Sequence, residues 1–352
     1  MKIIHCADLH LDSAMDSRLP SVKARERRAE LRRTFSNLID YALADGFDAV
    51  LICGDLFDEE KVPQPATVAN ILKMIENASS LRFYYLCGNH EGTSWLDLYP
   101  TPENLHVISG TGWTSFREED VTITGCDISS GTPSWDELRL DPDTYNIVML
   151  HGTVEGGKPD IPLKKLAGRN VDYLALGHIH SFKDGKLDKR GVYAYSGCLE
   201  GRGFDETGEK GFVVLDTNVP SYCFVPANGR RIAVVKVPVD GCAAQTELES
   251  RMKDIISTLD RGTILRVVFC GSLSQSCQLD TADLERILEP EFYYAEVKDD
   301  TVPEIPLSEL QSQQSLKGVF ARLVMSSDIS DDMKGKVIQV GLKALRGERP
   351  EL

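Results

Sequence analysis

The sequence predicts an α/β fold whose functional side chains gather at one edge of a sheet, and three observations support this. Short apolar runs alternate with helical stretches through about the first 215 residues, a pattern typical of strands covered on both faces. Side chains that can bind metals come directly after several of these runs. The chain of 352 residues is also long for a single core, so two domains are expected.

The elements of the first part follow from the spacing of their apolar residues. Residues 2–7 form an apolar run that is too short for the core of a signal peptide and is expected to be a strand. Residues 23–44 carry apolar side chains at helical spacing. Further strands are expected at 48–53, 82–87, 146–150 and 171–176, a helix at 66–77, and a later, more antiparallel set of strands at 121–125, 192–195 and 212–216.

A break is expected near residues 219–229, which gives a first domain of residues 1–225 and a second of residues 230–352. The second part contains no histidine, so it cannot supply imidazole ligands to a metal. We therefore expect an α+β capping or partner-binding domain. Its strands are expected at 232–237, 264–269 and 292–297, and its helices at 245–259, 280–288, 316–325 and 333–345.

Five short motifs in the first domain carry metal-binding side chains, and five of the seven histidines of the chain fall in them. Ligands bind beyond the carboxyl ends of strands in open α/β sheets, so we expect the motifs to meet at one rim. A single such motif is more often an ordinary turn, but five in order after apolar runs indicate a metal site. They are Asp8-Leu9-His10, Gly54-Asp55-Leu56-Phe57-Asp58, Gly88-Asn89-His90-Glu91, His151-Gly152 and Gly177-His178-Ile179-His180.

The residue types in these motifs match a pair of divalent cations. Asp8 and His10 are expected on the same side of an extended segment, so both can reach one cation. Asp55 can bridge two cations through its two oxygens, and His178 and His180 can each face a different one. Nitrogen and oxygen ligands without thiolates suit manganese, iron or zinc. Two such cations can activate a water that hydrolyses a phosphate ester.

Composition narrows the setting in which this chemistry takes place. The net charge of −15 argues against broad affinity for nucleic acid, although two bound cations would make the site itself positive. No apolar run approaches the roughly 20 residues of a membrane span. The nine cysteines are odd in number and contain no Cys-x-x-Cys pair. A reduced, cytoplasmic location is therefore expected.

The motif series resembles that of the calcineurin-like metallophosphoesterase superfamily over about residues 1–216. Residues 7–13, 54–58, 196–211 and 341–345 are also similar to the DNA-repair exonucleases of the SbcD type and their YhaO-like bacterial relatives. This resemblance implies a four-layer α/β/β/α sandwich. It also implies two metal sites, one formed by Asp8, His10 and His180, the other by Asn89, His151 and His178, with Asp55 shared between them.

The resemblance also suggests which residues act on the substrate. Relatives use the histidine corresponding to His90 near the leaving group, and we expect Asp58 to orient it, as a carboxylate can fix the tautomer of an imidazole. Some relatives carry a histidine where Asp58 stands, which leaves this assistance open. Arg202 is expected to contact a phosphate. The acidic residues that follow it, Glu206 among them, would repel phosphate and argue against a phosphate-binding loop there.

The leading hypothesis is a manganese-dependent DNA exonuclease or endonuclease subunit of a repair complex, with iron or zinc as other metals. The resemblance implies a coiled-coil ATPase of the SbcC type as a partner, docked on the C-terminal helices, and a homodimer. One alternative is a phosphodiesterase or phosphatase acting on a small molecule or a phosphoprotein. Another is a scaffold without catalysis, but that predicts missing ligands, and all seven positions are filled. The second domain favours the nuclease, because a phosphatase needs no such module.

Overall fold

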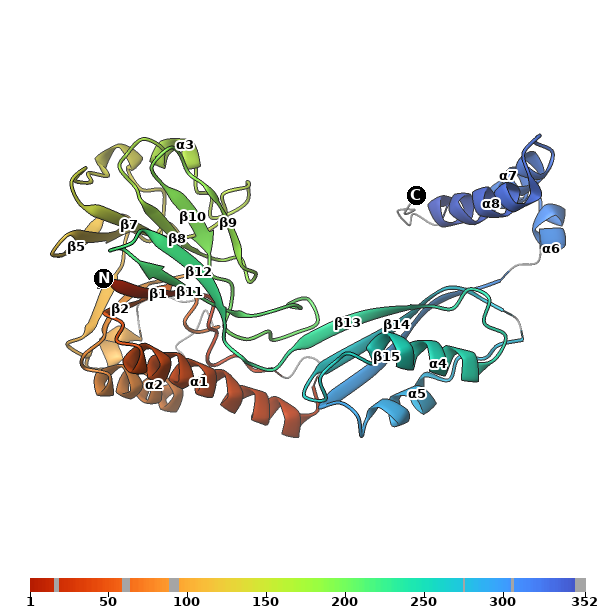
Figure 1. Cartoon of the computed structure of the whole chain (residues 1–352), viewed down its shortest axis with the longest axis horizontal. Helices are drawn as coiled ribbons and strands as arrows, with labels where there is room; N and C mark the ends of the chain where they lie inside the picture. The colour runs from red at the N-terminus through yellow and green to blue at the C-terminus, as the bar shows by residue number, and fades with distance from the viewer. Residues whose placement is uncertain (16–18, 59–63, 89–94, 275, 305–306, 346–352) are drawn as a thin grey trace. The chain divides into compact units, whose positions relative to one another are not determined.

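The computed structural model describes residues 1–15, 19–58, 64–88, 95–274, 276–304 and 307–345 (Figure 1). The chain forms two compact units, and each is described by itself. The first unit comprises Met1–Val234, Asp260–Leu265 and Phe292–Tyr294. The second comprises Val235–Leu259, Arg266–Glu291 and Ala295–Leu352. The first unit therefore includes two short segments from the part of the sequence beyond Val234.

Within the described residues, two six-stranded sheets form the body of the first unit. In the first sheet β1 to β4 are parallel, and β11 and β12 are antiparallel to their neighbours. Its order is β12 (Ser221–Pro226), β11 (Gly211–Asp216), β1 (Lys2–Cys6), β2 (Ala49–Cys53), β3 (Arg82–Leu86), β4 (Leu105–Ile108). The second has the order β5 (Thr114–Glu118), β6 (Val121–Gly125), β7 (Tyr145–His151), β8 (Tyr173–Gly177), β10 (Val192–Tyr195), β9 (Lys183–Lys186).

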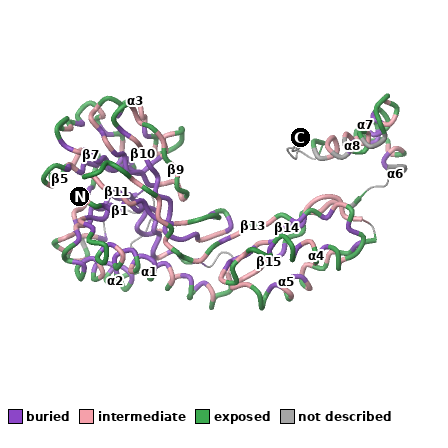
Figure 2. The backbone as a smooth tube through the Cα atoms, viewed as in Figure 1, coloured by how far each residue is buried: buried purple, intermediate pink, exposed green. Residues whose placement is uncertain are grey.

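Alternation along the strands of the first sheet supplies two separate cores. Ile4 and Val50 pack in the core that includes the buried side chains of α1 (Ser21–Ala44) and α2 (Pro65–Asn77). Their sequence neighbours Ile3 and Leu51 point the other way and pack with residues of the second sheet. Figure 2 shows this buried interior as the purple part of the tube.

The outer face of the second sheet carries the fourth layer. Val148 and Leu174 of that sheet pack with Leu166 of the short helix α3 (Leu163–Leu166). The predicted α/β/β/α order of layers is therefore confirmed. The outer layer is thin, because α3 has four residues and is accompanied by a 3₁₀ turn at Trp135–Glu137 and by loops.

The predicted strand directions were only partly right. The antiparallel prediction holds for β11, which is antiparallel to both neighbours. It is wrong for one side of β6 and of β10, because β6 pairs in parallel with β7 and β10 in parallel with β8. An apolar pattern records which faces of a strand are buried and says nothing about its direction.

The part of the chain from Ile232 onward forms a third sheet and several helices. The strand order is β13 (Ile232–Pro238), β14 (Ile264–Leu273), β15 (Tyr294–Pro303), and the helices are α4 (Gln245–Ile256), α5 (Thr281–Leu288), α6 (Leu307–Ser312), α7 (Leu316–Met325) and α8 (Asp331–Leu345). Ser315 caps α7 by accepting a hydrogen bond from the Gly318 N–H at 3.2 Å. None of the described helices combines the length and apolar character needed to cross a membrane.

His5 ties the two sheets of the first unit together. It lies on β1, and its Nε2 is 3.2 Å from the carbonyl oxygen of Leu176 on β8. Its Nδ1 is 2.9 Å from the hydroxyl of Tyr173 on the same strand. The Nε2–H therefore donates to the carbonyl while Nδ1 accepts from the hydroxyl. Burial lowers the pKa of His5 from 6.5 to about 3, so the imidazole is neutral in the folded protein.

This neutral histidine makes the first unit less stable in acid. Between pH 6.5 and pH 3 the unfolded chain binds a proton at His5 that the folded chain does not, so stability falls as the pH is lowered. We expect His5→Gln, which can also accept and donate here, to remove about 2 kcal/mol of the stability loss between pH 7 and pH 5. Urea unfolding followed by tryptophan fluorescence measures it, since all three tryptophans lie in the first unit. Equal pH dependence in both proteins would contradict this.

Candidate metal centre

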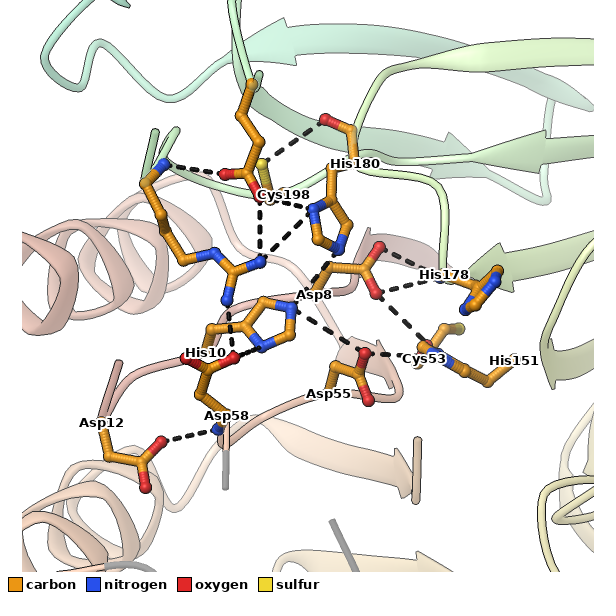
Figure 3. Close-up of polar contacts among 12 residues, drawn as sticks. Asp8, His10, Asp12, Cys53, Asp55, Asp58, His151, His178, His180 and Cys198 are labelled. Carbon is orange, nitrogen blue, oxygen red and sulfur yellow. Dashed lines mark hydrogen bonds and ion pairs between the residues drawn. The ribbon is translucent and has the colours of Figure 1, made fainter. Parts of the chain in front are cut away.

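The carboxyl ends of strands from both sheets bring the predicted ligands together (Figure 3). Asp8 and His10 follow β1, Asp55 follows β2, His151 ends β7, and His178 and His180 follow β8. Ligand atoms of Asp8, His10, Asp55 and His180 all lie within 4.8 Å of one another. The single rim expected from the sequence is thus built by two facing sheets. Asn89 and His90 lie outside the described residues.

Asp55 lies between two groups of imidazoles. Its Oδ2 is 3.8 Å from His10 Nε2 and 3.4 Å from His151 Nε2. His10 Nε2 is in turn 3.4 Å from His180 Nε2, whereas the rings of His151 and His178 have centroids 5.3 Å apart. One carboxylate oxygen therefore faces both groups, as a ligand shared by two cations would.

Left-handed backbone makes these side chains converge. Asp8, His10 and Asp55 have φ values of 54°, 44° and 51°, a region in which residues other than glycine are strained. Backbone hydrogen bonds of 3.0 Å from the Asp8 N–H to Gly54 O and from the His10 N–H to Asp55 O hold the two turns against each other. The expectation of an extended Asp8–His10 segment was therefore wrong, although both side chains do face one centre.

Two glycines leave room for the ligands. A Cβ atom at Gly88 would lie 1.9 Å from Asp55 Oδ1. A Cβ atom at Gly54 would lie 2.1 Å from His151 Nδ1, and Gly54 also has a φ of +90°. Neither position can accept a side chain without displacing Asp55 or His151, both predicted ligands.

Each histidine whose Nε2 faces the centre is held from behind through its Nδ1. Such partners fix the tautomer and aim the free nitrogen at a metal. A carboxylate serves this role for two of the three and a backbone carbonyl for the third. The pairs are His10 Nδ1 with Asp58 Oδ1 at 3.0 Å, His180 Nδ1 with Glu206 Oε1 at 2.6 Å, and His151 Nδ1 with the Cys53 carbonyl oxygen at 2.9 Å.

The carboxylates overcome the cost of burying these imidazoles. Burial lowers the pKa of His151, but the hydrogen bond and charge of Asp55 and the charge of Asp8 outweigh it and raise that pKa to about 9. Burial also opposes protonation of His180, yet Glu206 raises its pKa above the ordinary value. The site therefore favours positive charge, and a divalent cation would supply it in place of these protons.

Arg202 and Asp58 lie behind the ligands. Arg202 Nη1 donates to Asp58 Oδ1 at 2.7 Å, and Nη2 donates to Glu206 Oε1 at 2.9 Å. These two bonds use one N–H of each terminal nitrogen of Arg202, and its contact with phosphate stays a prediction. Asp58 contacts His10, and its predicted contact with His90 involves a residue outside the described part of the chain.

Glu206 contacts the predicted ligand His180, and the sequence gives no sign of this contact. From the sequence, Glu206 is expected only to repel phosphate. The one signal that could have found it is its spacing of four residues from Arg202, with which it forms an ion pair. Its pairing with His180 joins residues 26 positions apart and leaves no trace in a local pattern.

The donor set fits a divalent transition metal. It combines imidazole nitrogens with carboxylate oxygens and includes no thiolate, a mixture suited to manganese, iron or zinc. Four of the donors lie within 4.8 Å of one another, and the glycines keep the space around Asp55 and His151 open. The identity of the metal does not follow from this set.

Comparison with known proteins gives the family. The model of the family described as calcineurin-like phosphoesterase matches residues 1–182 and so spans every ligand position from Asp8 to His180. The chain belongs to this family. It is therefore a metallophosphoesterase, a hydrolase that uses divalent metals to cleave phosphate esters.

Individual relatives are more distant. The chain is 28% identical over 281 residues to the metallophosphoesterase YhaO of Bacillus subtilis. The matched region is 74% of this chain and 68% of YhaO. It is 24% identical over 366 residues to the DNA double-strand break repair protein Mre11 of Sulfolobus acidocaldarius, covering 95% and 91% of the two chains. The crystal structure of Pseudomonas putida nuclease MPE is 12% identical in sequence, and the match covers 62% of this chain and 85% of that protein. Its TM-score of 0.28 is too low to support an inference.

Loss of the Glu206 charge should weaken metal binding. We expect Glu206→Gln to reduce Mn²⁺ affinity roughly 10- to 100-fold, because His180 loses the carboxylate that orients it. Isothermal titration of the metal-free protein measures this. The exposed neighbour in Glu209→Gln is the matched control and should bind as the unaltered protein does. Equal affinity of both variants would show that Glu206 does not support a ligand.

Filling the space at Gly88 should disrupt the shared ligand. Gly88→Ala places a methyl group on Asp55, so we expect it to lose metal and phosphoesterase activity while far-ultraviolet circular dichroism stays unchanged. Gly112→Ala is the control, because a Cβ atom there meets nothing within 4 Å. Metal content after gel filtration measures the effect, and full occupancy in Gly88→Ala would rule out the proposed close contact.

Proposed function

We propose that this protein is a DNA nuclease that cleaves phosphodiester bonds with a water activated by two divalent cations, most simply manganese. The position of Asp55 between two groups of imidazoles carries this proposal. Bound there, the cations would lower the pKa of a water toward ~7 and neutralise the phosphate oxygens. Iron or zinc would satisfy the same donors.

Seven residues are proposed as metal ligands. Asp55 is shared, and the two remaining groups lie on either side of it. The first group is Asp8, His10 and His180, and the second is Asn89, His151 and His178. The distances among the described members support this division, because His10 and His180 approach each other while His151 stacks edge-on with His178.

Other residues are proposed to act around the ligands. His90 is proposed to stabilise or protonate the leaving oxygen. Asp58 contributes by holding His10, with Arg202 compensating its charge. A direct contact between Arg202 and phosphate stays a prediction.

Two observations bear on DNA as the substrate. The match to an archaeal Mre11 extends over 95% of this chain, so it includes the second unit as well as the metal centre. The net charge of −15 argues against DNA as the substrate, because it repels the phosphate backbone, and it favours the alternative, a small-molecule phosphodiesterase or phosphatase. We give more weight to the extent of the match, and infer that affinity for DNA depends on the bound cations and on a partner.

The surface of α7 supports a partner at the C-terminal end. Leu316, Val319 and Leu323 are 70%, 44% and 65% exposed and lie on one side of the helix, while Ala321 and Val324 are buried on the other. An exposed apolar stripe of this kind suits docking of another helix. A coiled-coil ATPase of the SbcC type is the proposed partner, and a homodimer and a cytoplasmic location stay predictions.

A comparison of substrates tests the proposal. Purified protein with Mn²⁺ is offered linear duplex DNA, single-stranded DNA, bis-p-nitrophenyl phosphate and p-nitrophenyl phosphate, and Asp55→Asn serves as the control for contaminating nucleases. We expect DNA and the diester to be cleaved, the monoester to be spared, and Asp55→Asn to lose at least ~100-fold in rate, since removing a bridging ligand disables both metal sites. Rapid cleavage of the monoester with DNA intact would instead identify a phosphatase.

A further inference from the structure

A buried ion pair lies behind the metal centre. Arg27 of α1 is 1% exposed, and its Nη2 is 2.6 Å from Oε2 of Glu200, which is 4% exposed. The same nitrogen donates to the carbonyl oxygen of Gly201 at 3.0 Å. Glu200 Oε1 also accepts a hydrogen bond of 2.5 Å from the hydroxyl of Thr34, which lies about two helical turns after Arg27 in α1.

Stability alone gives a weak reason for such a pair. Removing two charges from water costs several kcal/mol per ion, and apolar residues of similar volume often stabilise a protein as well or better. The other buried positions of α1 toward the core are mostly apolar, as in Leu31, Phe35 and Leu38. We therefore look for a role of the ion pair in holding the backbone that it contacts.

The backbone that it holds leads directly to the supports of the metal ligands. Gly201 is followed by Arg202, whose guanidinium reaches Asp58 and Glu206. The Arg202 N–H also donates to Glu206 Oε2 at 2.7 Å, which closes the loop of residues 200–206 on itself. The turn is tight, because a Cβ atom at Gly201 would lie 2.6 Å from the Glu206 carbonyl oxygen.

Arg27 is itself fixed from the other side. Glu30 Oε2 is 2.5 Å from Arg27 Nη1 and accepts a second bond of 3.1 Å from Arg230 Nε. Arg230 in turn donates to the Gly262 carbonyl oxygen at 2.7 Å and lies over the Tyr293 ring at 3.5 Å from its centroid. Arg27 thus connects the part of α1 that is held by Glu30 and Arg230 to the loop of residues 200–206.

We propose that Arg27 and Glu200 are positioning residues for the metal centre. They fix the loop of residues 200–206 so that Arg202 and Glu206 stand where they hold the imidazoles of His10 and His180. Neither residue is a metal ligand, and both act through the loop. The proposal rests on the ligand assignment made above and is independent of whether DNA is the substrate.

Mn²⁺ affinity of the metal-free protein tests this role without reference to turnover. We expect Arg27→Met to bind Mn²⁺ roughly 10- to 100-fold more weakly, the range typical of groups that orient ligands. Arg27→Lys keeps the charge, with all donors on a single nitrogen, and should recover part of the loss. Thr34→Val removes only the hydroxyl that holds Glu200, and we expect a smaller loss of about 3- to 10-fold. If Arg27→Met does not fold, the Mn²⁺ affinity of Thr34→Val tests the positioning role in its place.

A remote ion pair provides the control for general destabilisation. Arg190 pairs with Asp172 at 2.8 Å and donates to the Thr144 carbonyl oxygen at 2.9 Å, at the amino ends of β7 and β8 and therefore opposite the rim. Arg190→Met should unfold at a lower temperature with unchanged Mn²⁺ affinity. An equal loss of affinity in this variant would overturn the positioning role.

A double variant tests whether Arg27 acts through the proposed route. Arg27→Met combined with Glu206→Gln should lose clearly less affinity than the sum of the two single effects, because both changes release the imidazole of His180. Fully additive losses, or an unchanged affinity in folded Arg27→Met and Thr34→Val, would refute the proposal. Failure of the unaltered protein to bind Mn²⁺, Fe²⁺ or Zn²⁺ would instead refute the ligand assignment.

Discussion

Face-to-face packing of the two sheets is the constraint on which the metal centre depends. Asp8, His10 and Asp55 come from the first sheet, whereas His151 and His180 come from the second. No local motif can bring these groups together, so the centre exists only because the apolar layer between the sheets sets their separation. The hydrogen bonds from the His178 N–H to the Asp8 carboxylate then align the rims at atomic detail, at 2.9 and 3.1 Å.

The amount of structure that could be predicted follows from which information is local. The spacing of apolar residues fixes α1 and α7 to within two residues of their observed ends, because a buried face leaves a periodic mark in the sequence. The pairing of strands into two sheets leaves no such mark, and only a family resemblance suggested it. The left-handed turn at Asp8 and His10 was likewise missed, since its cause is a hydrogen-bonded partner turn some 45 residues away at Gly54 and Asp55.

Asp58 and Glu206 place negative charge beside a site that would take an anionic phosphate ester. Each carboxylate contacts an imidazole and also Arg202. Despite burial, His10 and His180, with help from Arg202, hold the pKa values of the Asp58 and Glu206 carboxyl groups well below their usual range. Their charges therefore strengthen the ligands while one guanidinium compensates them locally.

The division of the third sheet has a consequence for how such proteins can be rebuilt. Each of β13, β14 and β15 begins in the first unit and continues into the second, and the chain returns to the first unit twice in between, so the polypeptide crosses the border five times. Deleting the chain after Val234 would remove Ile264 and Tyr294 from the small cluster that they form with Phe204 and Ile232. Recombination that exchanges the second unit must therefore join it to the first at five junctions, three of them within strands, and a protease that cuts one of these connections leaves four intact.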